Sequence, residues 1–263
     1  MPEYNNRTTK LRENAMLTKE YYDVLLDTLP ADSPLTVARI VRGVSWTAAV
    51  LSDGRCGVGM HTTGESFPRR FETLEGLPLR LAAEALLSWN FEEASEGMAV
   101  INAWYNTAAH GEALGCGYTE SALTGLDLSG RTVGFVGHLV RHSGITEELL
   151  SPAKAWYIME REPKPGDYPD SACEYLLPEC DLVVVTGSAA INKTMPRILE
   201  LSRNAEIVLT GPSVTLCPEL LAAFSLRRLN TQAITEVAPM LDKIVRERSS
   251  VNAFSRHFTL DRC

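Results

Sequence analysis

The stretch CDLVVVTG, residues 180–187, decides the fold, because it is a short apolar run that ends in a hydroxyl residue and a glycine. Apolar runs without strict polar alternation are typical of parallel strands in a sheet that is covered on both faces. Four more such runs, separated by helix-like segments, are RTVGFVG at 131–137, KAWYIMERE at 154–162, AEIVLTGPS at 205–213 and LRRLNTQAI at 226–234. We therefore predict a doubly wound α/β domain over residues 126–263, with helices on both faces of a mainly parallel sheet.

The first half of the chain has a different pattern. Residues 36–60, TVARIVRGVSWTAAVLSDGRCGVGM, alternate and are rich in β-branched side chains, which indicates antiparallel strands joined by a hairpin turn. Helical patterns precede and follow this segment, and one of them covers residues 91–107. These features predict an α+β domain over residues 14–125, and the polar, unpatterned residues 1–13 predict a flexible arm.

The composition is that of an ordinary globular protein, with 45% hydrophobic and 22% charged residues and a formal net charge of −8. This acidic balance argues against nucleic-acid binding, because nucleic-acid-binding domains gather Lys and Arg on one face. No run is apolar enough to cross a bilayer, and the polar start lacks the apolar core of a signal peptide. The six cysteines then indicate reduced thiols. We expect a cytoplasmic protein with a small-molecule ligand and no membrane partner, and a homo-oligomer stays open.

The ends of the predicted strands carry the residues best suited to binding a ligand. In an open parallel sheet, ligands bind beyond the carboxyl ends of the strands, where glycine permits close approach and hydroxyl groups donate hydrogen bonds. The candidates at these ends are Gly137, His138, Glu160, Thr186, Gly187, Gly211, Pro212 and Ser213. Asn192, Lys193 and Thr194 follow the third strand, and they either donate to an anionic ligand or only cap the next helix.

The glycines after the first strand do not form a dinucleotide-binding motif. Gly134, Gly137 and Gly144 lack the G-x-G-x-x-G spacing, and no GK[ST] follows a glycine loop. Glu160 lies about 20 residues beyond Gly137, where a ribose-binding acid would sit, although an acid at a strand end also occurs as an ion-pair partner. The sequence therefore predicts no NAD motif of standard spacing.

The predicted helix over 91–107 carries a second stripe beside its apolar face. This stripe is small and mostly uncharged, and its members are Glu92, Ser95, Ala99, Asn102 and Asn106. A solvated helix face usually carries Lys, Arg and Glu, so the composition favours the wall of a narrow polar cleft over an exposed surface. His61 and Glu65 lie in a polar turn that could reach the same cleft.

Several stretches match one known family in order: EASEGMAVINA at 93–103, GFVGH at 134–138, the segment 160–187 with its GDYPDSACEYLLPEC, INKT at 191–194, and TGPS at 210–213. They resemble the family described as putative heavy-metal chelation. The resemblance implies an enolase N-terminal-like domain, then an atypical Rossmann-like domain, with a site between them. The family pattern falls on Asn102, Gly137, His138, Glu160, Thr186, Gly187, Asn192, Thr194, Gly211, Pro212 and Ser213. The family usually has glycine where this chain has Lys193.

The leading hypothesis is a protein that binds a small polar or anionic ligand, a heavy-metal ion or a metal chelate, in the cleft between the two domains. His138 and Glu160 would ligate a divalent transition metal, with a third ligand from His61, from Glu65 or from the chelator itself. Because two protein ligands make a weak site, we expect the metal to enter mainly as a chelate whose anionic part Lys193 would hold. The alternatives are an enzyme of unknown reaction with Glu160 or His138 as acid or base, and a scaffold with a vestigial site.

Overall fold

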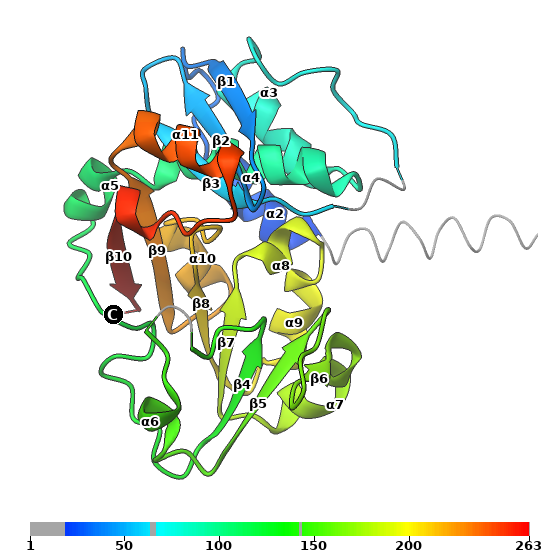
Figure 1. Cartoon of the computed structure of the whole chain (residues 1–263), viewed down its shortest axis with the longest axis vertical. Coiled ribbons are helices and arrows are strands. Elements are labelled where there is room, and N and C mark those ends of the chain that lie inside the picture. Colours follow the sequence, from blue (N-terminus) through cyan, green and yellow to red (C-terminus); the bar gives the residue numbers. More distant parts are fainter. Residues whose placement is uncertain (1–18, 64–66, 142–143, 263) are drawn as a thin grey trace, which may run out of the picture.

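The computed structural model describes residues 19–63, 67–141 and 144–262. Two sheets organise this part of the chain: a small antiparallel sheet above a larger, mostly parallel one (Figure 1). The predicted arm over residues 1–13 lies outside the described residues. No helix within the described part is long and apolar enough to span a bilayer.

The small sheet confirms the strands expected between residues 36 and 60. Its order is β1-β2-β3, and both neighbouring pairs are antiparallel. The strands are β1 (Val37–Arg42), β2 (Trp46–Leu51) and β3 (Cys56–Met60). The helical elements that belong to this half are α2 (Lys19–Asp27), α3 (Leu79–Ala83), η1 (Glu84–Leu87), α4 (Phe91–Tyr105) and α5 (Ala108–Ala113).

Helices cover both faces of the small sheet. On one face α4 packs against β2 and β3 so closely that a Cβ on Gly57 would lie 2.0 Å from the backbone nitrogen of Ala103. The other face holds α11 (Val237–Arg246), which crosses the sheet in Figure 1. Its buried Met240 and Ile244 contact the apolar side chains of the strands. The segment that forms α11 thus returns to the small sheet, although sequence patterns assigned it to the second domain, and the chain then ends in the large sheet with β10 (Ser255–Asp261).

The large sheet has the strand order β10-β9-β8-β7-β4-β5-β6. All neighbouring pairs are parallel except β9 with β10, which are antiparallel. Five strands fall where the apolar runs predicted them: β4 (Thr132–Val136), β5 (Ala155–Glu160), β7 (Leu182–Thr186), β8 (Glu206–Thr210) and β9 (Arg228–Ile234). The other two are β6 (Tyr168–Pro169) and β10 (Ser255–Asp261).

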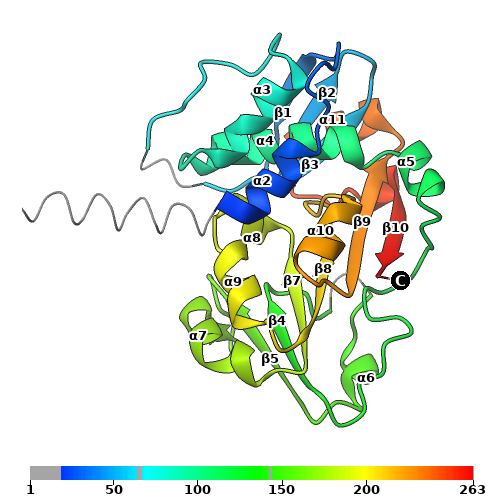
Figure 2. The same cartoon turned by 180° about the vertical axis from the view of Figure 1, so that it is seen from behind.

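The two faces of the large sheet are covered differently. One face carries a row of short helices (Figure 2): α7 (Cys173–Leu176), α8 (Ser188–Ile191), α9 (Met195–Leu201) and α10 (Pro218–Ala223). The opposite face is covered by α6 (Glu147–Leu150) and by buried side chains of the segment 122–128, which is mostly turn. The remaining short turns are η2 (Asp170–Ala172), η3 (Leu177–Glu179) and η4 (Asn252–Phe254).

One continuous hydrophobic core joins the two sheets. It contains α2 and α4 side chains such as Leu25 and Met98 together with Ile191 and Leu220 from the helices over the large sheet. Tyr22 adds a buried hydrogen bond from its hydroxyl to the carbonyl oxygen of Ala190 at 2.8 Å. The two sheets are therefore fixed against each other by packing, and only part of their junction is open.

Candidate functional site

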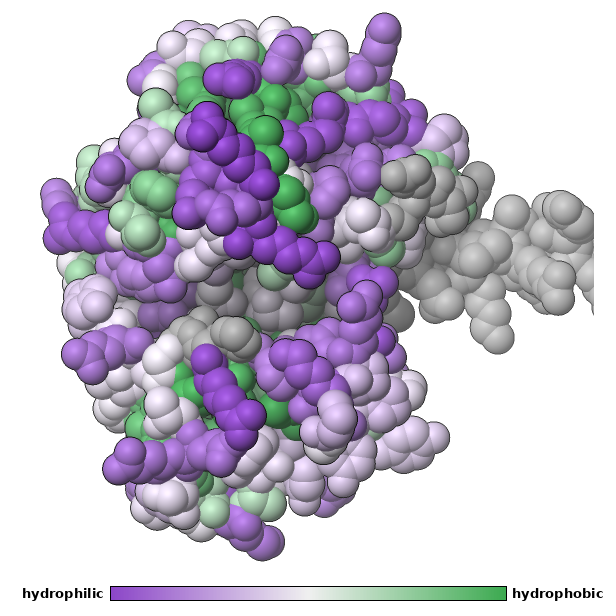
Figure 3. All heavy atoms as spheres, in the orientation of Figure 1, coloured by the Kyte–Doolittle hydropathy of each residue, from purple (hydrophilic) through white to green (hydrophobic). Residues whose placement is uncertain are grey.

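A cavity of about 830 Å³ opens at the carboxyl edge of the large sheet. The ends of β4, β5 and β7 line it from below, and residues 60–63, at the end of β3 and directly after it, line it from above. Figure 3 shows this face recessed where the two parts meet, with hydrophilic side chains along its rim. Six predicted site residues line the cavity: Gly137, His138, Glu160, Thr186, Asn192 and Thr194.

The ends of β4 and β5 are held together by Glu160. Its Oε2 accepts the backbone amide of His138 at 2.8 Å, and its Oε1 accepts the amide of Arg161 at 2.7 Å. Gly137 makes this turn possible, because its φ of 102° is rarely adopted by residues with a side chain. Glu160 therefore organises the turn after β4, and its carboxylate faces backbone donors.

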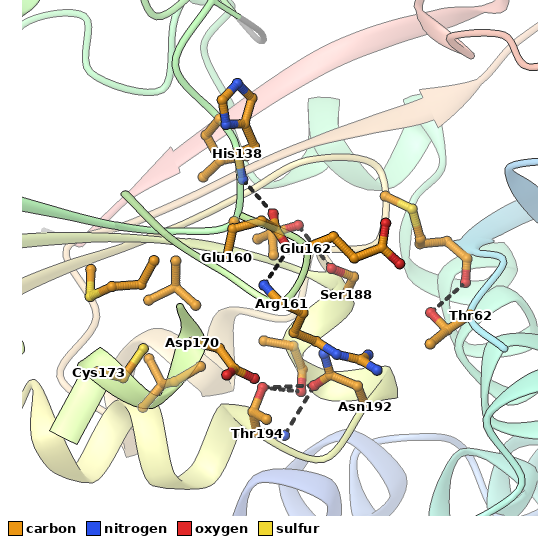
Figure 4. A pocket seen from close by; sticks show the side chains of 18 of the residues that line it. Thr62, His138, Glu160, Arg161, Glu162, Asp170, Cys173, Ser188, Asn192 and Thr194 are labelled. Carbon is orange, nitrogen blue, oxygen red and sulfur yellow. Dashed lines mark hydrogen bonds between the residues drawn. The ribbon is translucent and has the colours of Figure 1, made fainter. Parts of the chain in front are cut away.

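The imidazole of His138 points away from the Glu160 carboxylate (Figure 4). Its Nδ1 lies 3.0 Å from Oδ2 of Asp167, whose side chain is only 5% exposed. Asp167 comes from the turn between β5 and β6, within the GDYPD motif. The structure thus brings His138 to the cavity, but it does not direct the two proposed metal ligands at one point.

Hydroxyl and amide groups form the third side of the cavity, after β7. The Thr186 and Ser188 hydroxyls lie 3.1 Å apart, and Asn192 Oδ1 accepts the hydroxyl of Thr194 at 2.7 Å. Thr194 occupies the N-cap position of α9, but its side chain makes no capping bond. A plain helix cap therefore does not account for the Thr194 side chain, which bonds to Asn192 instead (Figure 4).

Lys193 lies between two residues that line the cavity, but its own side chain leaves in another direction. The ammonium donates to the carbonyl oxygens of Leu86 and Ile191 and lies 5.4 Å from the centre of the Tyr22 ring. Burial lowers the pKa of Lys193 to about 7. The expectation that Lys193 holds an anionic ligand does not fit this position, since the ammonium already caps the ends of η1 and α8.

The predicted polar cleft along α4 is closed. Asn102 is fully buried, and its amide nitrogen donates to the carbonyl oxygens of Val58 at 2.8 Å and Pro212 at 3.4 Å. Its Oδ1 accepts the Thr215 hydroxyl at 2.6 Å. The Asn102 side chain is thus matched to groups on β3 and in the loop after β8, which explains an uncharged amide at this position. Asn102 therefore faces the end of β8, as expected, but it is closed off from solvent and does not line the described cavity, so the cleft-wall interpretation is wrong for this residue.

The TGPS motif has a similar role in joining the sheets. The Ser213 hydroxyl accepts the backbone amide of Met60 at 2.8 Å, and Pro212 accepts from Asn102. A Cβ on Gly187 would lie 2.5 Å from the carbonyl carbon of Ser213, so only glycine allows this approach. Gly187, Gly211, Pro212 and Ser213 are absent from the residues that line the described cavity.

Several lining residues were missed from the sequence. Arg161, Glu162 and Lys164 directly follow the β5 end, and within the described residues no ion pair involves them. Figure 4 shows the Arg161 side chain running toward Asn192. Their position straight after a strand end was the available signal, but exposed charges in a loop are common.

The described residues do not suit a resident metal ion. No group of three or more His, Cys, Asp or Glu side chains comes together among them in a form that could hold one. Burial, ahead of the nearby Asp170 charge, raises the pKa of Cys173 to about 11, so this thiol stays protonated at neutral pH. His61 lines the cavity with Nδ1 3.2 Å from the Thr47 hydroxyl, and Glu65, the other suggested third ligand, lies outside the described residues.

A cavity at the carboxyl edge of a mainly parallel sheet is the usual ligand position in α/β proteins. Two family models match this chain, DUF364 over residues 123–261 and DUF4213 over residues 22–105, and both are described as "putative heavy-metal chelation". The first alone spans more than half of the chain, so the protein belongs to this family.

Solved relatives share the whole architecture. The chain is similar to a DUF364-family protein of unknown function from Desulfitobacterium hafniense, with 33% identity, a TM-score of 0.78, and coverage of 92% of this chain and 98% of that one. A second, from Pyrococcus horikoshii, shares the fold at 20% identity and a TM-score of 0.66, over 94% of this chain and 98% of its own. The uncharacterised protein MJ0500 of Methanocaldococcus jannaschii is 29% identical over 156 residues, and the match covers 57% of this chain and 58% of that protein.

Proposed function

We propose that this protein binds a small anionic organic ligand, a metal chelate in keeping with its family, in the cavity at the carboxyl edge of the large sheet. In this proposal the chain consists of an enolase N-terminal-like domain over residues 14–125 and a Rossmann-like domain over residues 126–263. The observation that carries it is the cavity itself, because six residues from separate motifs line it together.

The lining supports an organic ligand with both polar and apolar parts. Buried Met159, Cys173 and Ile198 give one apolar side, against which a carbon skeleton could pack. Arg161 and Lys164 lie at the exposed rim and supply positive charge for a carboxylate or phosphate group. These two cations take the anion-binding role that was predicted for Lys193 from the sequence.

The metal in this proposal is cargo. A chelator that fills most of the metal's coordination positions needs few protein ligands, and His138 alone could complete them. A bare ion would need three or more groups, and the described residues do not provide such a cluster. The chelate form therefore agrees better with the donor set than a direct ion site does.

The test is isothermal titration of the full chain with NiCl₂, with citrate, and with the preformed Ni²⁺–citrate complex. We expect the complex to bind at least about tenfold more tightly than either component, and Arg161→Ala to weaken it by about tenfold, or 1.4 kcal/mol. Lys154→Ala is the matched control, since Lys154 is exposed at the opposite, amino end of β5.

Two outcomes would overturn the proposal. Tight binding of free Ni²⁺ that is lost in His138→Ala but survives Arg161→Ala would indicate a direct metal site. No heat with any of the three probes would contradict the chelate form and favour the enzyme.

The enzyme remains the second candidate because of one contact. Many general bases are histidines in a cavity whose imidazole contacts a carboxylate. Here Oδ2 of Asp167 lies 3.0 Å from Nδ1 of His138. Glu160 is the weaker candidate for acid or base, because both of its oxygens accept backbone amides.

A further inference from the structure

The turn between β5 and β6 is built to present a carboxylate to His138. Residues 164–167 read Lys-Pro-Gly-Asp, and the Asp167 amide donates to the Lys164 carbonyl oxygen at 2.9 Å. Gly166 has a φ of 100°, and proline followed by such a glycine is the signature of a type II turn. The local sequence therefore fixes where the Asp167 side chain begins.

One oxygen of Asp167 serves two partners. Its Oδ2 accepts the Lys164 amide at 3.0 Å and lies 3.0 Å from Nδ1 of His138. A carboxylate only accepts hydrogen bonds, so the imidazole must be the donor in this contact and must carry a proton on Nδ1. In the neutral ring the lone pair then belongs to Nε2.

We infer that Asp167 is a positioning residue, which holds His138 as the Nδ1-protonated tautomer and so makes Nε2 the nitrogen that acts on the ligand. A carboxylate on the far nitrogen fixes ring orientation and raises the basicity of the acting nitrogen, in metal ligands and in general bases alike. This inference rests on the proposed function, because it takes the ligand to occupy the cavity that His138 lines.

The inference also gives a role to the GDYPD segment, which sequence comparison singled out without a function. The charged neighbours of Asp167 in this turn, Lys164 and Asp170, are exposed. Only 5% of the Asp167 side chain is accessible, compared with 21% for its partner His138. An acidic side chain is rarely so buried unless it is paired.

The tautomer can be measured in the free protein by long-range ¹H–¹⁵N correlation NMR on full-length chain labelled at its five histidines. Signals of His138 are assigned by their loss in His138→Gln. At pH 8, where an ordinary imidazole is neutral, we expect the Nδ1–H pattern at His138 in the wild type. Asp167→Ala should make this pattern a minor form, because the acceptor is gone.

Asp167→Asn is the conservative rescue. The Lys164 amide needs an acceptor at the Oδ2 position, so the new amide should turn its oxygen there and still accept from Nδ1–H. Glu179→Ala, an exposed change in η3, is the control and should leave the His138 signals unchanged. Methyl spectra of each variant report whether the fold is intact.

The inference is overturned if wild-type His138 shows the Nε2–H pattern, or if a folded Asp167→Ala variant keeps the Nδ1–H pattern. Titration of the same variants with Ni²⁺–citrate is read separately. The expected tautomers together with no binding of the complex would contradict the proposed function and leave the role of Asp167 in place.

Discussion

The backbone amide of His138, after the first strand of the large sheet, donates to the carboxylate of Glu160, at the end of the second, over 2.8 Å. This contact joins two neighbouring strand ends at the floor of the cavity. It also explains why an acidic residue occurs at this strand end although the chain has no dinucleotide-binding motif. The carboxylate accepts hydrogen bonds from backbone amides of the protein, where in a dinucleotide-binding protein it would accept them from a ribose.

The role of Glu160 can be tested through stability. We expect Glu160→Ala to lower the free energy of unfolding by about 1–3 kcal/mol, because two backbone amides lose a charged acceptor. Glu160→Gln should cost less, since its amide oxygen can still accept one of them. Urea denaturation measures both, and exposed Glu162→Ala should stay within about 0.5 kcal/mol of the wild type. Equal effects at 160 and 162 would contradict this assignment.

Asn102 is expected to matter for stability and not for ligand binding. Asn102→Ala removes the donor to buried carbonyl groups and leaves the Thr215 hydroxyl with only the Met98 sulfur, at a cost of about 1–3 kcal/mol. Thr215→Val breaks the same bond from the other side. Denaturation of both single variants and the double variant should therefore show coupling of about 0.5–3 kcal/mol. Strict additivity, or a folded Asn102→Ala variant that loses Ni²⁺–citrate binding while Thr215→Val keeps it, would return Asn102 to the site.

Gly187 is expected to tolerate no side chain although its φ is ordinary. The Cβ of Gly187→Ala would lie 2.5 Å from backbone atoms of Ser213 and Val214, which cannot move as a flexible side chain would. We expect a loss of about 1–3 kcal/mol by thermal or urea denaturation. Gly117→Ala is the matched control, because its Cβ meets nothing within 4 Å, and it should change stability by less than about 0.5 kcal/mol. A stable Gly187→Ala variant would mean that the turn after β7 and the loop after β8 can move apart at this point.

The sequence was sufficient for much of the fold, because the relevant signals are local. The apolar runs that became β4, β5, β7, β8 and β9 ended at residues that do meet at one edge. β6 was missed because two residues carry no periodicity. The return of α11 to the small sheet could not be predicted, since an amphipathic helix does not specify which surface its apolar face will cover.

The candidate site was predicted less well, because a residue's position in a motif does not fix where its side chain points. Asn192 and Thr194 reach the cavity, while Lys193 between them turns toward Leu86. The left-handed backbone at Lys193, with a φ of 69°, reverses the direction of this one side chain. It also explains the glycine that the family usually has there, because glycine adopts this conformation without steric cost. Asp167 lay inside a matched motif, but its partner is 29 residues away.

Lys193 should make stability depend on pH. Its pKa falls to about 7 in the folded protein, so between pH 7 and its ordinary value near 10.5 the unfolded chain binds more protons. The free energy of unfolding should therefore rise with pH through this window, by at most about 1.4 kcal/mol per pH unit from this group.

Lys193→Met should lose that rise while keeping the left-handed backbone strain. Lys193→Gly should lose it too, but it should be about 1 kcal/mol more stable than the methionine variant because the strain is relieved. Urea denaturation at pH 7, 8 and 9 measures both effects, with exposed Lys154→Met as the control that keeps the wild-type pH dependence. An unchanged slope in Lys193→Met would show that the ammonium stays charged between its two carbonyl partners across this range.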